Sequence, residues 1–364
     1  MTRKGAFSKL GRLCKKLFCC VALRLSSLQR NKKYAPFGPR VCGIPKESRA
    51  LHNELFTLPS ESCLFTEDAV MDYLLEIKNL VKRYKEIVAV DNISFSIRQG
   101  ICFGLIGPNG AGKTTTIEMI EDMISPTSGE ILYKGKPRSS LFKQEVGIQF
   151  QQTNLLSSLT IRETLSTFKS LYNNPADIEE IIDICNLREI QKRLNDRISG
   201  GQKQRLMLAL AMINNPELLF LDEPSTGLDP QARRNLWSIV KKIKERGNTI
   251  ILTTHYMEEA ERLCDEIAIM DKGRIIAQGT PDQLIKEYCE GVTVILPRNS
   301  IKIPLSSLPF SFREINGRIE IRTNDINSCL NKLLSEQADL TEMIVRSPSL
   351  ENVFLNLTGK QLRE

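Results

Sequence analysis

The chain has 364 residues, of which 41% are hydrophobic and 26% charged, so it holds material for about two folded domains and is not mainly disordered. Ten cysteines occur without any Cys-x-x-Cys spacing, and five lie in the first 63 residues, which favours neither a zinc site nor a disulfide framework. Charged residues interrupt every hydrophobic run before the ~18 residues that a membrane-spanning helix needs. We therefore expect a protein of the reducing cytosol, and any membrane role must come from a partner.

Positive charge is concentrated at the amino terminus. The net charge is +7, but residues 1–50 hold 13 Lys and Arg against one acid, Glu47, while the remaining chain holds 37 basic and 42 acidic residues. A basic folded body would point to nucleic acid as a partner. This body is mildly acidic, so no nucleic acid partner is expected.

Three interpretations of the leader, residues 1–70, stay open. Leucines and a valine at helical spacing between basic residues in 10–28 fit a helix lying on an anionic membrane surface. Residues 31–62 are rich in Pro, Gly and Ser without any period, which is typical of a linker or of disorder. Met71 directly precedes a strand pattern, so translation starting there would make 1–70 an overlong gene prediction. We describe 1–70 as a basic, largely disordered leader.

A phosphate-binding loop is predicted in residues 101–120, where an apolar run, a glycine-rich turn and a helical pattern succeed one another. Gly107, Gly112, Lys113 and Thr114 satisfy the spacing G-x-x-x-x-G-K-[ST] in the strand, loop and helix context that its mechanism requires. Successive N–H groups and the helix start favour an anion, Lys113 reaches its outer phosphates, and Thr114 places a hydroxyl on Mg²⁺. A glycine-rich turn with an incidental lysine is the alternative.

Two adjacent acids, Asp222 and Glu223, follow the compact apolar run 218–221, which predicts a parallel strand buried on both faces. Ligands of open α/β sheets bind beyond the carboxyl ends of the strands. Asp222 is therefore expected beside the phosphates on the magnesium side, with Glu223 free to act on water. The alternative is a pair of solvated acids.

A second helix start suited to an anion is predicted at Ser199, in the sequence RISGGQKQR. The residues ISGGQ resemble the LSGGQ signature of ATP-binding-cassette (ABC) ATPases, with Ile198 in place of Leu. Further motifs occur in the order of that family: Tyr84 before the loop, Gln151 in VGIQFQQ, TGLD after Glu223, and His255 in TTHYMEEA. The resemblance covers residues 72–288 and lacks the coiled-coil insertion of the chromosome-maintenance branch.

The resemblance implies an α/β fold, a P-loop NTPase cassette with a helical subdomain, over residues 71–289. Residues 290–364 are expected to form a small α+β accessory domain, with a hairpin about Asn316-Gly317, helices near 326–334 and 350–357, and Gly359 as a C-cap. One face of the first helix should hold Ile326, Leu330, Leu333 and Leu334. The tail SLENVFLNLTGKQLR resembles that of daunorubicin-type drug-resistance exporters and of related polysaccharide and lipid exporters.

The resemblance also assigns catalytic roles. Glu223 resembles the general base that polarises the attacking water, and His255 the γ-phosphate contact; a lone histidine is otherwise more often structural. Lys113 and Gln151 complete the catalytic set. Thr114, Gln151 and Asp222 are expected to hold Mg²⁺.

The resemblance implies the residues that contact ATP as well. Adenine is expected to stack on Tyr84, for which a core tyrosine is the alternative. The phosphates are expected on Gly107, Pro108, Asn109, Gly110, Ala111, Gly112, Lys113, Thr114 and Thr115. Because the chain has a single phosphate loop, the resemblance implies a head-to-tail dimer in which the second subunit contributes Ser199, Gly200, Gly201, Gln202 and Asp229.

The function implied is that of a peripheral ATPase subunit, with ATP and Mg²⁺ as cofactors, on the cytoplasmic face of the inner (plasma) membrane. As a homodimer it would drive a separate integral-membrane permease to export a hydrophobic or amphipathic substrate of the drug, lipid or polysaccharide type. A soluble ABC ATPase acting on ribosomes or DNA is the alternative, although such proteins usually have tandem cassettes or a coiled-coil insertion. A nucleotide switch without turnover is disfavoured because Glu223, Gln151 and His255 are all present.

Overall fold

The computed structural model describes residues 73–149, 155–301 and 309–359. The leader 1–70 and Gln151 lie outside the described residues. The helices are α2 (Lys113–Ile120), α3 (Phe142–Glu145), α4 (Ile161–Lys169), α5 (Ile178–Ile184), α6 (Gly200–Ala211), α7 (Pro230–Glu245), α8 (Met257–Leu263), α9 (Pro281–Tyr288), α10 (Ile326–Ser335) and α11 (Leu350–Thr358).

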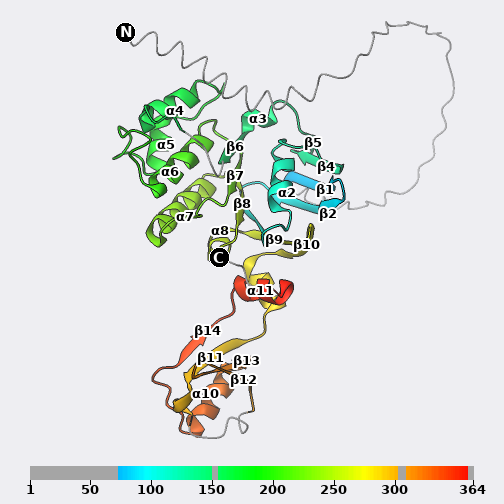
Figure 1. Ribbon diagram of the computed structural model, residues 1–364, viewed down its shortest axis with the longest axis vertical. Helices are drawn as coiled ribbons and strands as arrows, with labels where there is room; N and C mark the ends of the chain where they lie inside the picture. The colour runs from blue at the N-terminus through cyan, green and yellow to red at the C-terminus, as the bar shows by residue number, and fades with distance from the viewer. Residues whose placement is uncertain (1–72, 150–154, 302–308, 360–364) are drawn as a thin grey trace, which may run out of the picture. The chain divides into compact units, whose positions relative to one another are not determined.

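The strands fall into three sheets (Figure 1). The antiparallel sheet has β1 (Tyr73–Tyr84), β2 (Ile87–Arg98), β4 (Ser128–Tyr133) and β5 (Lys136–Pro137). The central sheet has β3 (Cys102–Ile106), β6 (Val146–Gln149), β7 (Leu218–Asp222), β8 (Thr249–Thr254), β9 (Glu266–Asp271) and β10 (Arg274–Gly279). The third sheet has β11 (Val292–Pro297), β12 (Ser311–Ile315), β13 (Arg318–Thr323) and β14 (Ile344–Arg346).

The central sheet is buried on both faces. Its order is β10-β9-β3-β8-β7-β6, and all neighbours are parallel except β10 with β9. Alternate residues of β7 enter different cores: Leu219 and Leu221 pack with the helices α6, α7 and α8, while Leu218 and Phe220 pack with α2 and the antiparallel sheet. This two-sided burial explains the uninterrupted apolar run read in the sequence and confirms the predicted α/β class.

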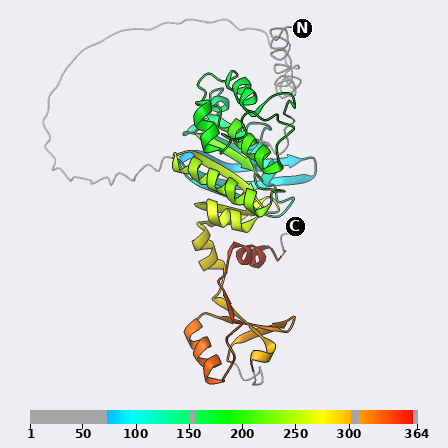
Figure 2. The ribbon, with the colours of Figure 1, turned by 90° about the vertical axis from the view of Figure 1, so that its left-hand side faces the viewer.

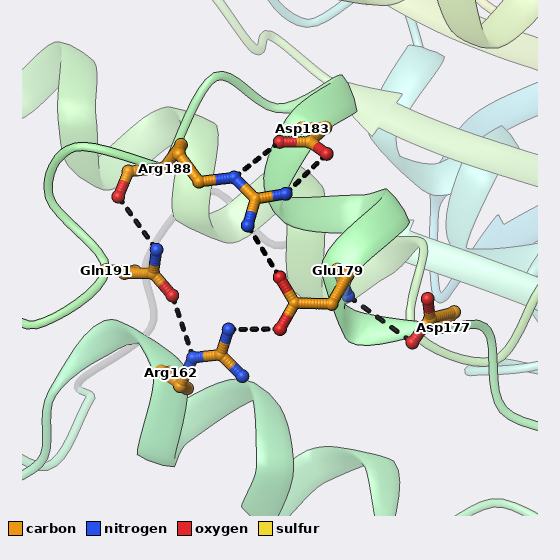
Figure 3. A network of polar contacts seen from close by, with 6 residues as sticks. All are labelled: Arg162, Asp177, Glu179, Asp183, Arg188 and Gln191. Carbon is orange, nitrogen blue, oxygen red and sulfur yellow. Dashed lines mark hydrogen bonds and ion pairs between the residues drawn. The ribbon is translucent and has the colours of Figure 1, made fainter.

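The helical subdomain, α4 to α6, carries a polar network on its surface (Figure 3). Arg162 of α4 donates to the Glu179 carboxylate of α5, and Arg188 Nη1 donates to the other Glu179 oxygen at 2.7 Å. Arg188 also binds Asp183, and Gln191 joins the two arginines through Arg162 Nε at 2.7 Å and the Arg188 carbonyl at 2.9 Å. The hydrogen bond from Arg162 leads the interactions that hold the pKa of Glu179 below its ordinary value. The network links α4 to α5, but exposed ion pairs of this kind add little stability.

The C-terminal sheet confirms the local predictions for this region. β12 and β13 form the hairpin about Asn316-Gly317, with both residues at positive φ of 51° and 71°, and Gly359 caps α11 in the left-handed region. The predicted face of α10 is partly wrong: Leu333 is fully buried, but Leu334 is 57% exposed and Cys329 lies inside instead. Cys329 and Leu333, four residues apart, share the buried face of the helix, and Leu334 therefore lies on its solvent side.

The last helix returns to the cassette. Leu350, Val353 and Phe354 of α11 are fully buried in the same hydrophobic cluster as α7 and α8. Leu350 N donates to Glu261 Oε2 on α8 at 3.3 Å, and Asn356 Nδ2 donates to the Tyr288 carbonyl at the end of α9 at 2.8 Å. Figure 2 shows the chain leaving through α9 and coming back through β14 to α11. The division expected at residue 290 therefore leaves α11 packed in the cassette core.

Candidate active site

The phosphate loop joins β3 to α2, as predicted. Lys113 is 7% exposed, and its Nζ donates to the carbonyls of Gly107 at 2.8 Å and Pro108 at 3.1 Å. Burial lowers the pKa of Lys113, and the charges of Glu223 and Asp222 oppose that shift. Lys113 is therefore close enough to both acids for their charges to affect its pKa. Its ammonium group is held by the two loop carbonyls, which a phosphate bound in the loop can replace.

Glycine is required at Gly112 for two reasons. Its φ is 103°, which side chains rarely adopt, and a Cβ placed there would lie 2.4 Å from the Ala89 carbonyl oxygen. Gly107 faces a similar restriction, since a Cβ would come within 2.1 Å of the Met270 carbonyl oxygen. Close backbone packing therefore fixes the curvature of the loop.

The loop's remaining predicted contacts differ in exposure. Asn109, Gly110 and Thr114 are exposed, Pro108 and Thr115 are half-buried, and Ala111 is buried. Thr114 stands in the first turn of α2, a helix whose N-terminal N–H groups favour an anion.

Asp222 ends β7, where it pairs with Thr253 of β8 and accepts a hydrogen bond from the Thr253 hydroxyl. Desolvation raises the pKa of Asp222, opposed by that hydrogen bond and by Lys113, while the charge of Glu223 adds to the rise. A cation bound here would relieve the crowding of negative charge. The Thr114 hydroxyl and the Asp222 carboxylate are hard oxygen donors of the kind that Mg²⁺ takes together with substrate phosphates, so the residues present fit that ion.

Glu223 occupies a strained position directly after β7. Its φ is 47°, a left-handed value uncommon for a non-glycine residue, and such outliers cluster at functional sites. The Glu223 N–H donates to the Thr253 carbonyl at 3.0 Å and contacts its hydroxyl at 3.1 Å, which hold the backbone in place. The Thr226 hydroxyl donates to Glu223 Oε2 at 3.2 Å. Hydrogen bonds therefore hold the backbone and the carboxylate of Glu223, so this acid is not merely solvated.

His255 follows β8 and meets Glu223 across the sheet edge. His255 Nδ1 lies 3.5 Å from Glu223 Oε1, and the two side chains are 25% and 22% exposed. The imidazole packs on Tyr256 with the ring centroids 4.2 Å apart. The structure thus brings these two predicted residues together at the carboxyl ends of neighbouring strands.

Tyr84 ends β1 and is 46% exposed, so it is not a core tyrosine. Lys82 Nζ lies 5.1 Å from its ring centroid. An exposed ring next to the antiparallel sheet is available for stacking with a flat ligand.

Two of the residues predicted to act across a dimer, Ser199 and Asp229, form hydrogen bonds at helix starts within their own chain. Ser199 caps α6 in a reciprocal capping box: Gln202 N donates to Ser199 Oγ at 3.3 Å, and Ser199 N donates to Gln202 Oε1 at 3.0 Å. Asp229 caps α7, accepting from Gln231 N and Ala232 N at 3.0 and 2.9 Å. Ser199, Gly200 and Asp229 are exposed, and Gly201 is half-buried. Within the described part of the chain, no hydrogen bond joins these residues to the phosphate loop.

Sequence reasoning missed two residues of the site. Thr253 orients both acids, yet only strand pairing reveals that it faces Asp222. Glu121, the C-cap residue directly after α2, has its pKa raised to about 8, chiefly by desolvation and then by the charges of Asp222 and Glu118. No local pattern marks a partly buried acid of this kind.

A phosphate loop on a buried parallel strand, with paired acids at the end of a nearby strand, defines a P-loop nucleoside triphosphatase. Among protein families, the ABC transporter family matches residues 90–226. The Nod factor export ATP-binding protein I of Burkholderia pseudomallei (strain 1710b) is 38% identical over 299 residues, which cover 79% of this chain and 98% of that relative. The protein of the same description from Rhizobium sp. (strain N33) is 38% identical over 301 residues, with 80% and 98% covered.

Solved structures agree. The structure of cbiO1 from Clostridium perfringens, part of the ABC transporter complex cbiONQ, matches with a TM-score of 0.56 and 27% identity, covering 59% of this chain and 92% of that one. A dimeric, post-hydrolysis ATP-binding cassette, MJ0796 bound to ADP and Pi, matches with a TM-score of 0.50 and 26% identity, covering 57% and 98%. The chain belongs to the ABC transporter family, as an ATP-binding subunit that hydrolyses ATP.

Proposed function

We propose that this protein powers the export of an amphipathic substrate through a separate membrane permease, with Glu223 as the general base of ATP hydrolysis. The observation that carries the catalytic part is the placement of Glu223 beside His255 at the sheet edge, 3.5 Å apart, within electrostatic reach of Lys113. A general base must be held in place beside the water that it polarises. Thr253 holds the backbone N–H of Glu223, and the Thr226 hydroxyl donates to its carboxylate.

Each predicted residue takes a role in this scheme. Lys113 exchanges its loop carbonyls for the β- and γ-phosphates, while the N–H groups of the loop hold the same oxygens. Thr114, Asp222 and Gln151 hold Mg²⁺, which when bound neutralises charge on the phosphate oxygens. His255 contacts the γ-phosphate and keeps the attacking water in line with Glu223. Tyr84 stacks on adenine.

The site is completed by a second copy of the chain. The exposed helix start at Ser199 presents N–H groups that suit an anion, and the chain has one phosphate loop. We place Ser199, Gly200, Gly201, Gln202 and Asp229 of one subunit against the ATP held by the other. Dimeric cassettes among the structural relatives support this arrangement.

The relatives support a proposal for the substrate class. The two relatives reported above are described as Nod factor export proteins and align along 98% of their length. We therefore infer an amphipathic, lipid-bearing oligosaccharide of the Nod factor kind, and not a small drug, as the cargo. Among the described residues, no helix meets the length and apolarity of a membrane span. Our proposal assigns the path of the cargo to the permease and keeps this protein peripheral, on the cytoplasmic face.

Transport into inside-out membrane vesicles tests the proposal. The chain is expressed with the multi-span protein that co-purifies with it from solubilised membranes, and uptake of a radiolabelled acylated chitin oligosaccharide is followed with Mg-ATP. Uptake is expected with the wild-type chain and not with Glu223→Gln. Co-purification of ribosomes or DNA in place of a multi-span protein, or equal uptake with both variants, would contradict it.

A further inference from the structure

A buried carboxylate outside the proposed catalytic set lies beneath the site. Glu259 of α8 is 0% exposed, and its Oε1 accepts a hydrogen bond from Trp237 Nε1 of α7 at 2.8 Å. Acids are almost never fully buried unless they are paired, so this one requires an explanation.

Three complementary polar atoms gather there without partners. Glu259 Oε2, Ser225 Oγ and Arg233 Nε are all buried and form no hydrogen bond of good geometry in the described structure. Nevertheless, the Ser225 and Thr254 hydroxyls and the charge of Arg233 lie close enough to lower the pKa of Glu259, against a larger rise caused by desolvation. We call Glu259, Trp237, Ser225, Thr254 and Arg233 the Glu259 cluster. An acceptor and two donors left unpaired side by side indicate a contact that a small shift would complete.

The Glu259 cluster adjoins both segments that carry the proposed catalytic residues, one with Glu223 and the other with His255. Ser225 lies two residues after Glu223, in the segment that ends at Asp229, and Glu259 lies four residues after His255. The Arg233 guanidinium stacks on the Tyr256 ring at 4.1 Å, and that ring packs on the His255 imidazole. A change at Glu259 therefore reaches the segment 223–229 through Ser225, and reaches His255 through Arg233 and Tyr256.

We propose that Glu259 is a positioning residue: by accepting hydrogen bonds from Ser225 and Arg233, it holds the segment 223–229 where Glu223 faces His255 and Asp229 faces the second subunit. The inference rests on the roles proposed above for those three residues. Glu259 acts through its neighbours and does not touch the nucleotide.

Steady-state ATP hydrolysis by the full chain tests this role. Ser225→Ala removes only the hydroxyl. Glu259→Gln keeps an oxygen that can accept the hydrogen bond from Trp237, but it removes the negative charge that attracts Arg233. Tyr133→Phe is the matched control, because its hydroxyl is also buried and unpaired but lies on β4, in the core beneath the antiparallel sheet. We expect each cluster variant to lower kcat about tenfold while KM for ATP stays within about twofold, and the control to leave both unchanged.

The double variant gives a second readout that loss of stability alone would not produce. If Ser225 and Glu259 act through one contact, the double variant should be no slower than the slower single variant. Wild-type kcat in Ser225→Ala, or a double variant whose loss is the product of the two single losses, would overturn the proposal. Glu223→Gln, assayed in parallel, distinguishes failure of the proposed function from failure of the positioning role. If Glu223→Gln hydrolyses ATP at the wild-type rate, the proposed function is wrong. If Glu223→Gln is inactive but Ser225→Ala is fully active, only the positioning role of Glu259 is wrong.

Discussion

Glu223 and His255 approach each other within 3.5 Å although 32 positions separate them in the chain, because β7 and β8 are parallel neighbours that end at the same edge. Glu223 has a strained backbone, with a φ of 47°. The fold therefore fixes the two side chains relative to each other, and such preorganisation is the condition under which a general base is effective.

Glu223→Gln should nearly abolish turnover while leaving ATP binding in place. The amide keeps the shape and the Thr226 contact but cannot take a proton, so we expect phosphate release to fall by about 10² or more. Phosphate release and ATP affinity, measured on the same preparation, check this. A rate within a few-fold of wild type would remove Glu223 from the role of base.

Ser199→Arg should block hydrolysis by filling the surface that meets the partner's ATP, while each chain still binds nucleotide. The substitution also removes the cap of α6, which costs about 1 kcal/mol of stability. Ser199→Ala loses the same cap without adding bulk, so it controls for that effect and should retain far more activity. Unchanged turnover in Ser199→Arg would refute a shared site.

Glu121→Gln should stabilise the protein at alkaline pH only. Because the pKa of Glu121 is raised from 4.5 to about 8 in the folded chain, the folded state keeps a proton that the unfolded state releases across this window. The free energy of unfolding of the wild type therefore falls as pH rises from about 4.5 to 8, and the neutral amide escapes that loss.

Urea unfolding without nucleotide at pH 5 and pH 8.5 measures this. We expect Glu121→Gln to gain at least about 1 kcal/mol over wild type at pH 8.5 and little at pH 5. Glu130→Gln, an exposed acid on β4, should show the same small difference at both pH values. A gain for Glu121→Gln that does not depend on pH would contradict the raised pKa.

Phe354→Ala should destabilise the cassette itself. Phe354 is fully buried against the core that holds α7 and α8, so its removal leaves a cavity that costs about 3–5 kcal/mol. Glu351→Ala, on the exposed side of the same helix, should change the free energy of unfolding by less than about 1 kcal/mol. Denaturant midpoints that coincide for the two variants would show that α11 does not share the cassette core.

Local signals in the sequence predicted much of the fold. The apolar run before Asp222, the glycine-rich turn before Lys113, the capping serine at Ser199 and the Asn316-Gly317 turn each carry their structure within a few residues, and all appear as predicted.

What the sequence could not show depends on contacts between distant segments. Thr253 is one of several threonines in its strand, and only the pairing of β7 with β8 sets it beside Asp222. Glu259 lies in a stretch of charged residues that suggests a solvated helix face, yet the packing of α8 on α7 buries it. The packing of α11 in the cassette core likewise depends on tertiary contacts, and no local sequence pattern indicates it.

We propose that one ATP is enclosed between the phosphate loop of one subunit and the Ser199 helix start of another. Light scattering of Glu223→Gln with saturating Mg-ATP measures whether two chains enclose it. We expect twice the 41.2 kDa mass of one chain, with two bound ATP per dimer, and a single-chain mass when Ser199→Arg is added. A Glu223→Gln protein that binds ATP fully but keeps the mass of one chain would contradict it.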